Sequence, residues 1–365
     1  MRIAVNIARI LTGLLFIFSG LVKGIDPRGL AYKMQEFFEA WANAGFMKSM
    51  MMSLNDYALP FSLIMITLEV MVGVALLIGW QKKITTWILL LLILFFTFLT
   101  SYVLFSGKIR ACGCFGDCIP LTPIQTFTKD IILLFFSLLL LVKREYIQPI
   151  AKPLINNLAM AIALLATVFL QWYVLRHLPL IDCLPYKKGN NILELRKMPA
   201  DAVQDKFDYS FIYEKDGQKK EFSAQQLPDS TWKFSERKQK LIQKGNNNVP
   251  LINDFSLTDQ DGINQTDSIL NTPAEYSLFF IKEVPPDNGW IEKYRTFYHN
   301  SETQNKRVYV ITAQVNGVID FFIKHNLLAD DFLSADATAI KTAARVNPTL
   351  FKMRGPLVLD KLSWA

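Results

Sequence analysis

The sequence predicts a membrane-embedded bundle of helices followed by a soluble α/β domain. Residues 1 to about 178 are dominated by long runs of Leu, Ile, Phe, Val and Met, and 51% of all 365 residues are hydrophobic. From about residue 179 onward the composition is that of a soluble protein, and strand patterns come to alternate with helix patterns. We expect a four-helix membrane domain over residues 1–150, a fifth span over 151–178, a linker and β-hairpin region over 179–248, and an α/β domain over 249–365.

Five segments are long enough to cross a bilayer, which takes about 20 predominantly apolar residues. They are residues 3–22, 57–80, 84–105, 122–142 and 154–175. No small-residue cleavage site follows the first segment, so we expect a retained helix and not a signal peptide. The net charge of +7 does not indicate nucleic acid, because no basic stripe is interleaved with aromatic residues.

The short loops predict the orientation of the chain, because Lys and Arg concentrate on the cytoplasmic side. With the N-terminus inside, the cytoplasmic segments hold Arg2, Lys82, Lys83, Lys143, Arg144 and Lys152. Arg176 and His177, just after the fifth span, argue mildly for the opposite orientation. We therefore predict a multi-pass protein of the bacterial inner membrane with a cytoplasmic N-terminus and a periplasmic C-terminal domain.

The first loop contains a predicted amphipathic helix. Asp26 and Pro27 are typical of an N-cap followed by proline at the first helical position. Apolar residues then recur at helical spacing from Leu30 to Trp41. Two placements remain open: on the outer membrane surface, or packed against the bundle.

Ionisable residues lie inside the predicted spans, where they are costly and need a partner or a cavity. Glu69 lies midway along the second span, and Lys129 and Asp130 lie within the fourth. We favour pairing between helices, with a proton path or a quinone contact as the functional alternative. Arg9 is expected to extend to the inner membrane surface.

The stretch ACGCFGDCIP, residues 111–120, holds three of the four cysteines, Cys112, Cys114 and Cys118. Cys183 is the remaining partner, and the predicted topology puts it near the same membrane surface. Four cysteines allow three pairings, and the sequence does not choose among them. A Cys112–Cys114 bond would close a very small, strained and readily reduced ring.

The same cluster leaves three chemical interpretations open. It can be a dithiol relay, a structural brace, or a metal site, although the paired C-x-x-C spacing of zinc sites is missing. Lys108 and Arg110 are expected to favour the thiolates, and Asp117 to oppose them. The histidines, His177, His299 and His325, form no constellation in the sequence.

The membrane part resembles known families. The stretches RILTGLLFIFSGLVKGIDP (9–27) and LEVMVGVALLIGW (68–80) resemble DoxX-type membrane proteins. The loop CGCFGD (112–117), followed by PIQTFTKDIILL, resembles MauE, the methylamine-utilisation membrane protein. This resemblance, over about residues 1–145, implies a four-helix, redox-associated membrane protein that supports disulfide formation or maturation of exported proteins.

The soluble part is predicted to start with a hairpin around Lys215-Asp216-Gly217, followed by a helix from Ser235 that ends near Gly245 and a linker. The strands and helices after residue 249, with the step VNPTLF, resemble the thioredoxin fold of membrane-tethered thiol proteins. That resemblance implies a cis proline at Pro348. The family's C-x-x-C would follow Val284, where this chain has PPDNGW, so the domain has no thiolate of its own for disulfide chemistry.

The sequence therefore predicts an accessory redox protein, with thiol–disulfide oxidoreductase activity left undecided. The expected chemistry is carried by Cys112, Cys114 and Cys118, with Cys183 resolving. The alternative is a non-enzymatic membrane scaffold with structural disulfides only. The expected partners are the lipid bilayer and an exported or periplasmic protein. No cofactor or metal is evident, and a quinone is considered as electron acceptor without a recognisable site.

Overall fold

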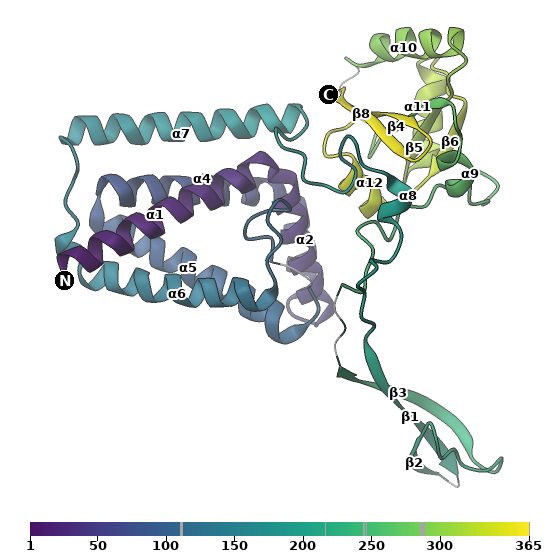
Figure 1. Cartoon of the computed structure of the whole chain (residues 1–365), viewed down its shortest axis with the longest axis horizontal. Helices are drawn as coiled ribbons and strands as arrows, with labels where there is room; N and C mark the ends of the chain where they lie inside the picture. Colours follow the sequence, from purple (N-terminus) through teal and green to yellow (C-terminus); the bar gives the residue numbers. More distant parts are fainter. Residues whose placement is uncertain (110–111, 216, 244, 246, 285–288, 365) are drawn as a thin grey trace.

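A computed structural model describes residues 1–109, 112–215, 217–243, 245, 247–284 and 289–364. Five of its helices are long and apolar enough to cross a membrane, which confirms the predicted spans. They are α1 (Arg2–Ile25), α4 (Ala58–Ile78), α5 (Lys82–Ser106), α6 (Pro123–Val142) and α7 (Pro153–Arg176). Figure 1 shows these helices side by side, with the soluble part at one end of the bundle. The 3-10 turn η2 (Arg144–Tyr146) follows α6.

Glycines let α1 and α4 pack closely. A Cβ atom on Gly73 would lie 2.8 Å from the carbonyl oxygen of Gly13, and one on Gly20 would lie 2.6 Å from the Val70 side chain. Small residues at such positions allow two membrane helices to approach backbone to backbone. The glycines of the two sequence stretches that resemble DoxX therefore hold this helix pair together.

The helix predicted in the first loop is α2 (Pro27–Asn43), followed by α3 (Lys48–Leu54) and the 3-10 turn η1 (Asn55–Tyr57). The Asp26 carboxylate accepts a hydrogen bond of 3.0 Å from the Gly29 backbone N–H, and Pro27 is the first helical residue, as predicted. In Figure 1, α2 runs across the ends of the bundle helices. Phe37 is buried against Val103 of α5, so α2 is packed on the bundle.

Arg9 does not extend to the membrane surface as we expected. Its side chain is buried and donates hydrogen bonds to the backbone carbonyls of Leu76 (2.7 Å), Leu77 (2.6 Å) and Gln148 (3.0 Å). The last carbonyls of a helix lack intrahelical partners. Arg9 therefore satisfies the C-terminal end of α4 from inside the bundle.

After the short helix α8 (Ile192–Leu195), three antiparallel strands form a separate small sheet in the order β2-β1-β3. They are β1 (Lys206–Lys215), β2 (Gln218–Ser223) and β3 (Lys233–Gln243). The predicted hairpin is β1 and β2, although Asp216 of its turn lies outside the described residues. The helix predicted over 235–245 is wrong, because this polar run lacks a continuous apolar face and instead pairs with the free edge of β1.

The last part of the chain is a five-stranded sheet with the order β6-β5-β4-β7-β8. Its strands are β4 (Glu275–Phe280), β5 (Val308–Thr312), β6 (Asp331–Ser334), β7 (Thr349–Arg354) and β8 (Leu357–Ser363). The first three are parallel, whereas β7 and β8 are antiparallel to their neighbours. The peptide bond between Asn347 and Pro348, just before β7, is cis, as the resemblance implied.

Four helices accompany this sheet: α9 (Thr266–Leu270), α10 (Ile291–Thr303), α11 (Val315–Lys324) and α12 (Ala337–Ala343). The sheet is buried on both faces, because Leu278 and Phe280 of β4 join one hydrophobic core and Phe279 joins the other. The predicted alternation of strands and helices is confirmed. The prediction missed β6, which has only four residues. We call residues 249–364 the outer domain.

Candidate functional site

The segment between α5 and α6 is the cysteine loop, whose described part includes Cys112, Cys114 and Cys118. Gly113 and Gly116 both have positive φ, of 72° and 58°, and the Gly116 N–H donates to the Gly113 carbonyl at 3.0 Å. Glycine adopts this left-handed backbone without steric cost. Gly113 and Gly116 therefore let the chain turn tightly between Cys112 and Cys118.

Cys118 and Cys183 form a disulfide with a Cα–Cα distance of 5.0 Å. The bond ties the cysteine loop to the segment that follows α7. The expectation that Cys183 lies beside the cluster is confirmed, although the sequence could not choose this pairing. Two of the four thiolates that a zinc site would use are thus joined to each other. Within the described residues, no group of three or more His, Cys, Asp or Glu side chains could hold a metal ion.

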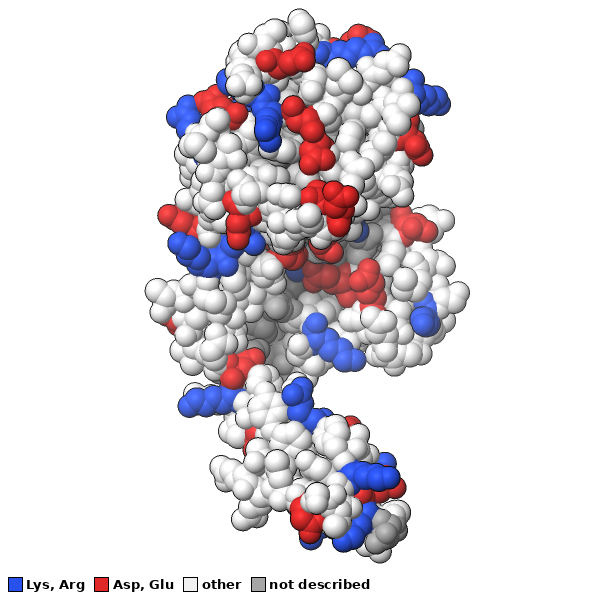
Figure 2. Space-filling view, turned by 90° about the vertical axis from the view of Figure 1, so that its right-hand side faces the viewer, with Lys and Arg blue, Asp and Glu red and all other residues white. Residues whose placement is uncertain are grey.

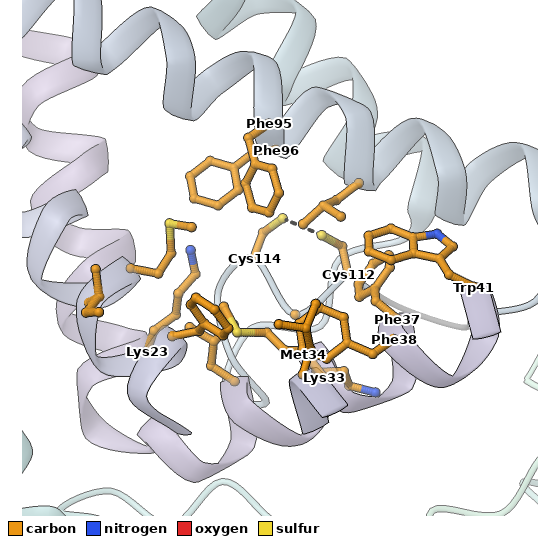
Figure 3. Close-up of a pocket in the computed structure, with 17 residues that line it drawn as sticks. Lys23, Lys33, Met34, Phe37, Phe38, Trp41, Phe95, Phe96, Cys112 and Cys114 are labelled. Atoms are coloured by element: carbon orange, nitrogen blue, oxygen red, sulfur yellow. Dashed lines mark hydrogen bonds between the residues drawn. The ribbon is translucent and has the colours of Figure 1, made fainter. Parts of the chain in front are cut away.

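Cys112 and Cys114 are free thiols whose sulfur atoms lie 3.2 Å apart and share a hydrogen bond, drawn as a dashed line in Figure 3. The hydrogen bond that the two thiols share lowers the pKa of Cys114, helped by the positive charges of Lys129 and Lys23 and opposed by burial. The same hydrogen bond, together with burial, raises the pKa of Cys112 well above its usual range. Of the two thiols, Cys114 is therefore the one that loses its proton more readily.

Among the described residues, the cations near these thiols are Lys23 and Lys129 and not the predicted Lys108. Lys108 is exposed, Arg110 lies outside the described residues, and Asp117 is engaged by an arginine of the outer domain. The sequence prediction missed Lys23 because it lies at the last turn of α1, outside the loop. The available signal for Lys23 was its spacing from Ser19, because residues four positions apart lie on one face of a helix.

The intramembrane acids are both paired. Glu69 of α4 forms an ion pair with Lys23 of α1 and accepts a hydrogen bond of 2.9 Å from the Ser19 hydroxyl. The Ser19 hydroxyl also lies 3.1 Å from the Cys114 carbonyl oxygen. For Glu69, the favoured interpretation of pairing between helices is confirmed. Ser19 therefore links the ion pair to the cysteine loop.

The second acid, Asp130, has partners on two helices. The Lys129 ammonium lies 2.7 Å from its carboxylate, and the Thr100 hydroxyl of α5 donates to it at 3.0 Å. The Lys129 ammonium also lies over the ring of Phe115, 5.1 Å from the ring centroid. Lys129 therefore joins α6 to the cysteine loop and brings a positive charge close to Cys114.

On its inner side the cysteine loop faces an apolar cavity of about 260 Å³. Figure 3 shows the two sulfur atoms at the cavity, with aromatic rings around it and the Lys23 amine pointing toward it. We call this space the inner cavity. Its walls come from α2, α4, α5, the end of α1 and the loop: Lys23, Leu30, Lys33, Met34, Phe37, Phe38, Trp41, Leu54, Phe61, Ile64, Met65, Phe95, Phe96, Leu99, Cys112, Gly113 and Cys114.

On its outer side the loop faces a larger cleft of about 730 Å³, which we call the outer cleft. Cys118 and Cys183 both line it, with Glu36 and Glu39 of α2 on one side and Lys341 of the outer domain on another. Figure 2 shows a hollow with acidic side chains in it, between the outer domain above and the three-stranded sheet below. The disulfide therefore borders an open cleft whose walls carry charged side chains of both signs.

A hollow of about 20 Å³ lies between the two spaces. Gly113 and Lys23 line both this hollow and the inner cavity, whereas Cys118 and Cys183 line both the hollow and the outer cleft. Lys33 of α2 lines all three. A thin layer of loop and α2 thus separates the disulfide from the free dithiol.

The outer domain is held over this layer by buried cations. The Arg345 guanidinium lies 2.7 Å from the Asp26 carboxylate and 3.0 Å from that of Asp117. Burial alone would lower the pKa of Arg345, but the charges of Asp26 and Asp117 raise it. Lys361 of β8 makes a further buried pair, of 2.8 Å, with Asp182 beside Cys183. Both contacts flank the disulfide.

The remaining predicted residues do not join the site. Residues 285–288, where a C-x-x-C would stand, lie outside the described residues. Pro348 begins the approach to β7, and its neighbour Asn347 accepts a hydrogen bond of 2.9 Å from the Lys282 backbone N–H. Among the described contacts, His177 lies against Tyr173, His299 approaches Glu302 at 3.9 Å and His325 makes a tilted ring contact with Phe321, and none of these contacts involves a cysteine.

Comparison with known proteins agrees with the geometry of the membrane part. Residues 1–143 match the family described as methylamine utilisation protein MauE, and residues 207–244, the three-stranded sheet, match a domain of unknown function, DUF8463. Over 131 residues, the chain is 33% identical to Protein TlpB of Flavobacterium psychrophilum. The aligned segment covers 35% of this chain and 33% of the relative. The chain therefore spans about a third of that relative's length. No solved structure matches it.

The family match covers α1 to α6, and with them all three cysteines of the loop. The disulfide partner Cys183 and the outer domain lie beyond it. The chain is thus a multi-pass membrane protein whose first 143 residues form a MauE-like region.

Proposed function

We propose that this protein is an accessory thiol–disulfide oxidoreductase of the bacterial inner membrane, which accepts electrons from exported proteins and passes them toward the membrane. One observation carries the proposal: a single short loop holds a disulfide that borders the outer cleft and a free dithiol that borders the inner cavity. A structural brace needs only the disulfide. The second is a reactive pair, because the hydrogen bond with Cys112 and the nearby charges of Lys129 and Lys23 lower the pKa of Cys114.

The first exchange takes place in the outer cleft. A thiolate of the reduced partner attacks one sulfur of the Cys118–Cys183 disulfide, which forms a mixed disulfide and releases the other cysteine as a thiolate. The partner's second thiol then displaces the mixed bond. The partner leaves with a new disulfide, and Cys118 and Cys183 keep its two electrons as thiols.

The second exchange crosses the loop. When Cys112 and Cys114 are joined as a disulfide, the Cys118 thiolate attacks that bond, and Cys183 then resolves the mixed disulfide that results. The outer disulfide forms again, and Cys112 and Cys114 become thiols. An oxidised outer pair beside a reduced inner pair is the arrangement reached at the end of this step.

The outer domain has a different role in this proposal, because the sequence contains no cysteine beyond Cys183. We propose that it is a thioredoxin-like domain that faces the periplasm and presents exported proteins to the outer cleft. Lys341 and Arg345 bring it to the rim of that cleft. Residues implied by the resemblance, including Pro348, would then contribute to binding and not to exchange.

The test uses the full chain in lipid nanodiscs and a reduced peptide with two cysteines. We expect the oxidised protein to convert the peptide to its disulfide, and Cys118→Ser to abolish this reaction. When the protein is first treated with diamide and the diamide is then removed, wild type should oxidise two peptides per chain, one for each disulfide, and Cys114→Ser should oxidise one. A protein that acts only as a scaffold would show no peptide oxidation in any form, and partner binding would survive Cys114→Ser.

A further inference from the structure

The electrons that reach Cys112 and Cys114 need an acceptor, and the two sulfurs border the inner cavity. Both cysteines and the glycine between them line its wall. The outer disulfide does not line it. An acceptor that oxidises the inner pair directly must therefore occupy this cavity, and its chemistry must match the walls.

The cavity opens toward the hydrocarbon of the bilayer. Phe61 and Ile64 of α4 and Phe95 of α5 line it and also have exposed fractions of 41%, 57% and 40%. All three belong to membrane-spanning helices, so their exposed surface contacts lipid. A ligand dissolved in the membrane can enter between α4 and α5, whereas the loop and α2 separate the cavity from the outer cleft.

The lining favours a flat, apolar ring that carries a polar atom at its edge. Phe37, Phe38 and Trp41 of α2 face Phe95 and Phe96 of α5 across the space, as Figure 3 shows. Aromatic side chains stack well on a planar π-system. A volume of about 260 Å³ suits one substituted ring, and the lipid-facing opening leaves room for a tail outside.

One cation is placed to meet the polar edge of such a ring. The Lys23 amine points toward the cavity and lies 4.8 Å from the centroid of the Phe96 ring. In contrast, Figure 3 shows the Lys33 amine pointing away from the cavity. Because its partner Glu69 fixes Lys23 from behind, the ammonium can donate a hydrogen bond to a carbonyl oxygen in the cavity.

We propose that the inner cavity binds the ring of an isoprenoid quinone, which oxidises Cys112 and Cys114. This inference rests on the proposed exchange function and names its electron acceptor. The Cys112 and Cys114 thiols lose two electrons and two protons and form their disulfide, and the quinone gains those electrons and protons to become the quinol. The Lys23 ammonium donates a hydrogen bond to the ring oxygen in this step.

The experiment uses the full chain in nanodiscs, reduced and then freed of reductant under anaerobic conditions. Decylubiquinone is the probe. Quinol formation is followed by the absorbance change, and the state of each cysteine is read by alkylation and mass spectrometry. We expect about two quinols per fully reduced protein, one for each disulfide that forms, and no quinol from Cys114→Ser.

A cavity-filling variant tests the place of binding. Ile64→Trp puts a large ring at the lipid-facing mouth and should slow quinol formation at least tenfold. Leu91→Trp is the matched control, because Leu91 is 61% exposed on α5 and does not line the cavity. It should react at the wild-type rate, and equal slowing of both variants would overturn the assignment.

Diamide separates this inference from the proposed function on which it rests. If diamide joins Cys112 and Cys114 but decylubiquinone leaves them reduced, the quinone site is refuted and the exchange function stands. If the diamide-oxidised protein cannot oxidise the dithiol peptide, the exchange function itself fails, whatever the quinone does.

Discussion

The guanidinium of Arg345 lies 2.7 Å from the carboxylate of Asp26, so one ion pair joins residues 319 positions apart in the chain. Asp26 is the N-cap of α2, the helix that forms a wall of both the inner cavity and the outer cleft. The same arginine holds Asp117, the residue just before the disulfide cysteine Cys118. The outer domain is therefore anchored at the two elements that enclose the cysteines.

Loss of this anchor should release the outer domain. Arg345→Met leaves Asp26 and Asp117 without their partner, and we expect faster reduction of the Cys118–Cys183 disulfide by a membrane-impermeant phosphine. Breaking a buried pair by removing one partner costs about 3–5 kcal/mol. The control is Arg354→Met, which removes an exposed pair with Glu275 and should leave the reduction rate unchanged. Equal reduction rates in both variants would contradict the anchor.

The two free thiols should react at different pH. The pKa of Cys114 is lowered and that of Cys112 is raised, so iodoacetamide should label Cys114 at a lower pH than Cys112 in the reduced protein. Site-resolved mass spectrometry after short pulses of label measures this. Lys129→Met removes one of the cations that favour the thiolate and should shift the Cys114 profile to higher pH. Lys108→Met, at an exposed position of the same loop, serves as the control and should leave the profile unchanged.

The buried pair of Lys23 and Glu69 should behave as a unit. Lys23→Met leaves the Glu69 carboxylate buried and unpaired, which costs about 3–5 kcal/mol of stability. The double variant Lys23→Met with Glu69→Leu should recover most of this loss, because two apolar side chains can replace a buried pair. Urea unfolding in detergent micelles gives both values. A double variant no more stable than the single one would show that the pair does not act as a unit.

The buried amine of Lys282 should make the outer domain more stable at alkaline pH. Burial, reinforced by the charges of Arg28 and Arg345, lowers its pKa to about 7, although Glu283 and Asp26 oppose the shift. Between about pH 7 and the ordinary lysine value of about 10.4, the unfolded chain binds a proton that the folded chain does not. Stability should therefore rise with pH in this window, by at most about 1.4 kcal/mol per pH unit.

The measurement compares wild type with Lys282→Met by urea unfolding between pH 7 and pH 10. The rise should be present in the wild type and absent from the variant, since other groups titrate equally in both. If the two curves stay parallel, Lys282 keeps its proton in the folded protein.

Local composition was enough to predict some parts of this molecule. The five spans follow from hydropathy, and the cap at Asp26 follows from two adjacent residues whose preferences do not depend on the rest of the chain. The strand–helix alternation of the outer domain also has a local origin. The polar run at 233–243 could not be predicted from local composition, because its strand conformation depends on pairing with β1.

The positions of the four cysteines in the sequence already limit sulfur chemistry to the cysteine loop and Cys183. The pairing of the sulfurs became visible in the folded chain alone. The fold also places the free pair at the inner cavity and the disulfide at the outer cleft. It also brought Lys23 from α1 and Arg345 from the outer domain to the two sides of the loop. The membrane spans could be predicted because hydropathy is a property of neighbours in sequence. Disulfide pairing, ion pairing and cavity lining instead depend on distances between helices that the linear order does not contain.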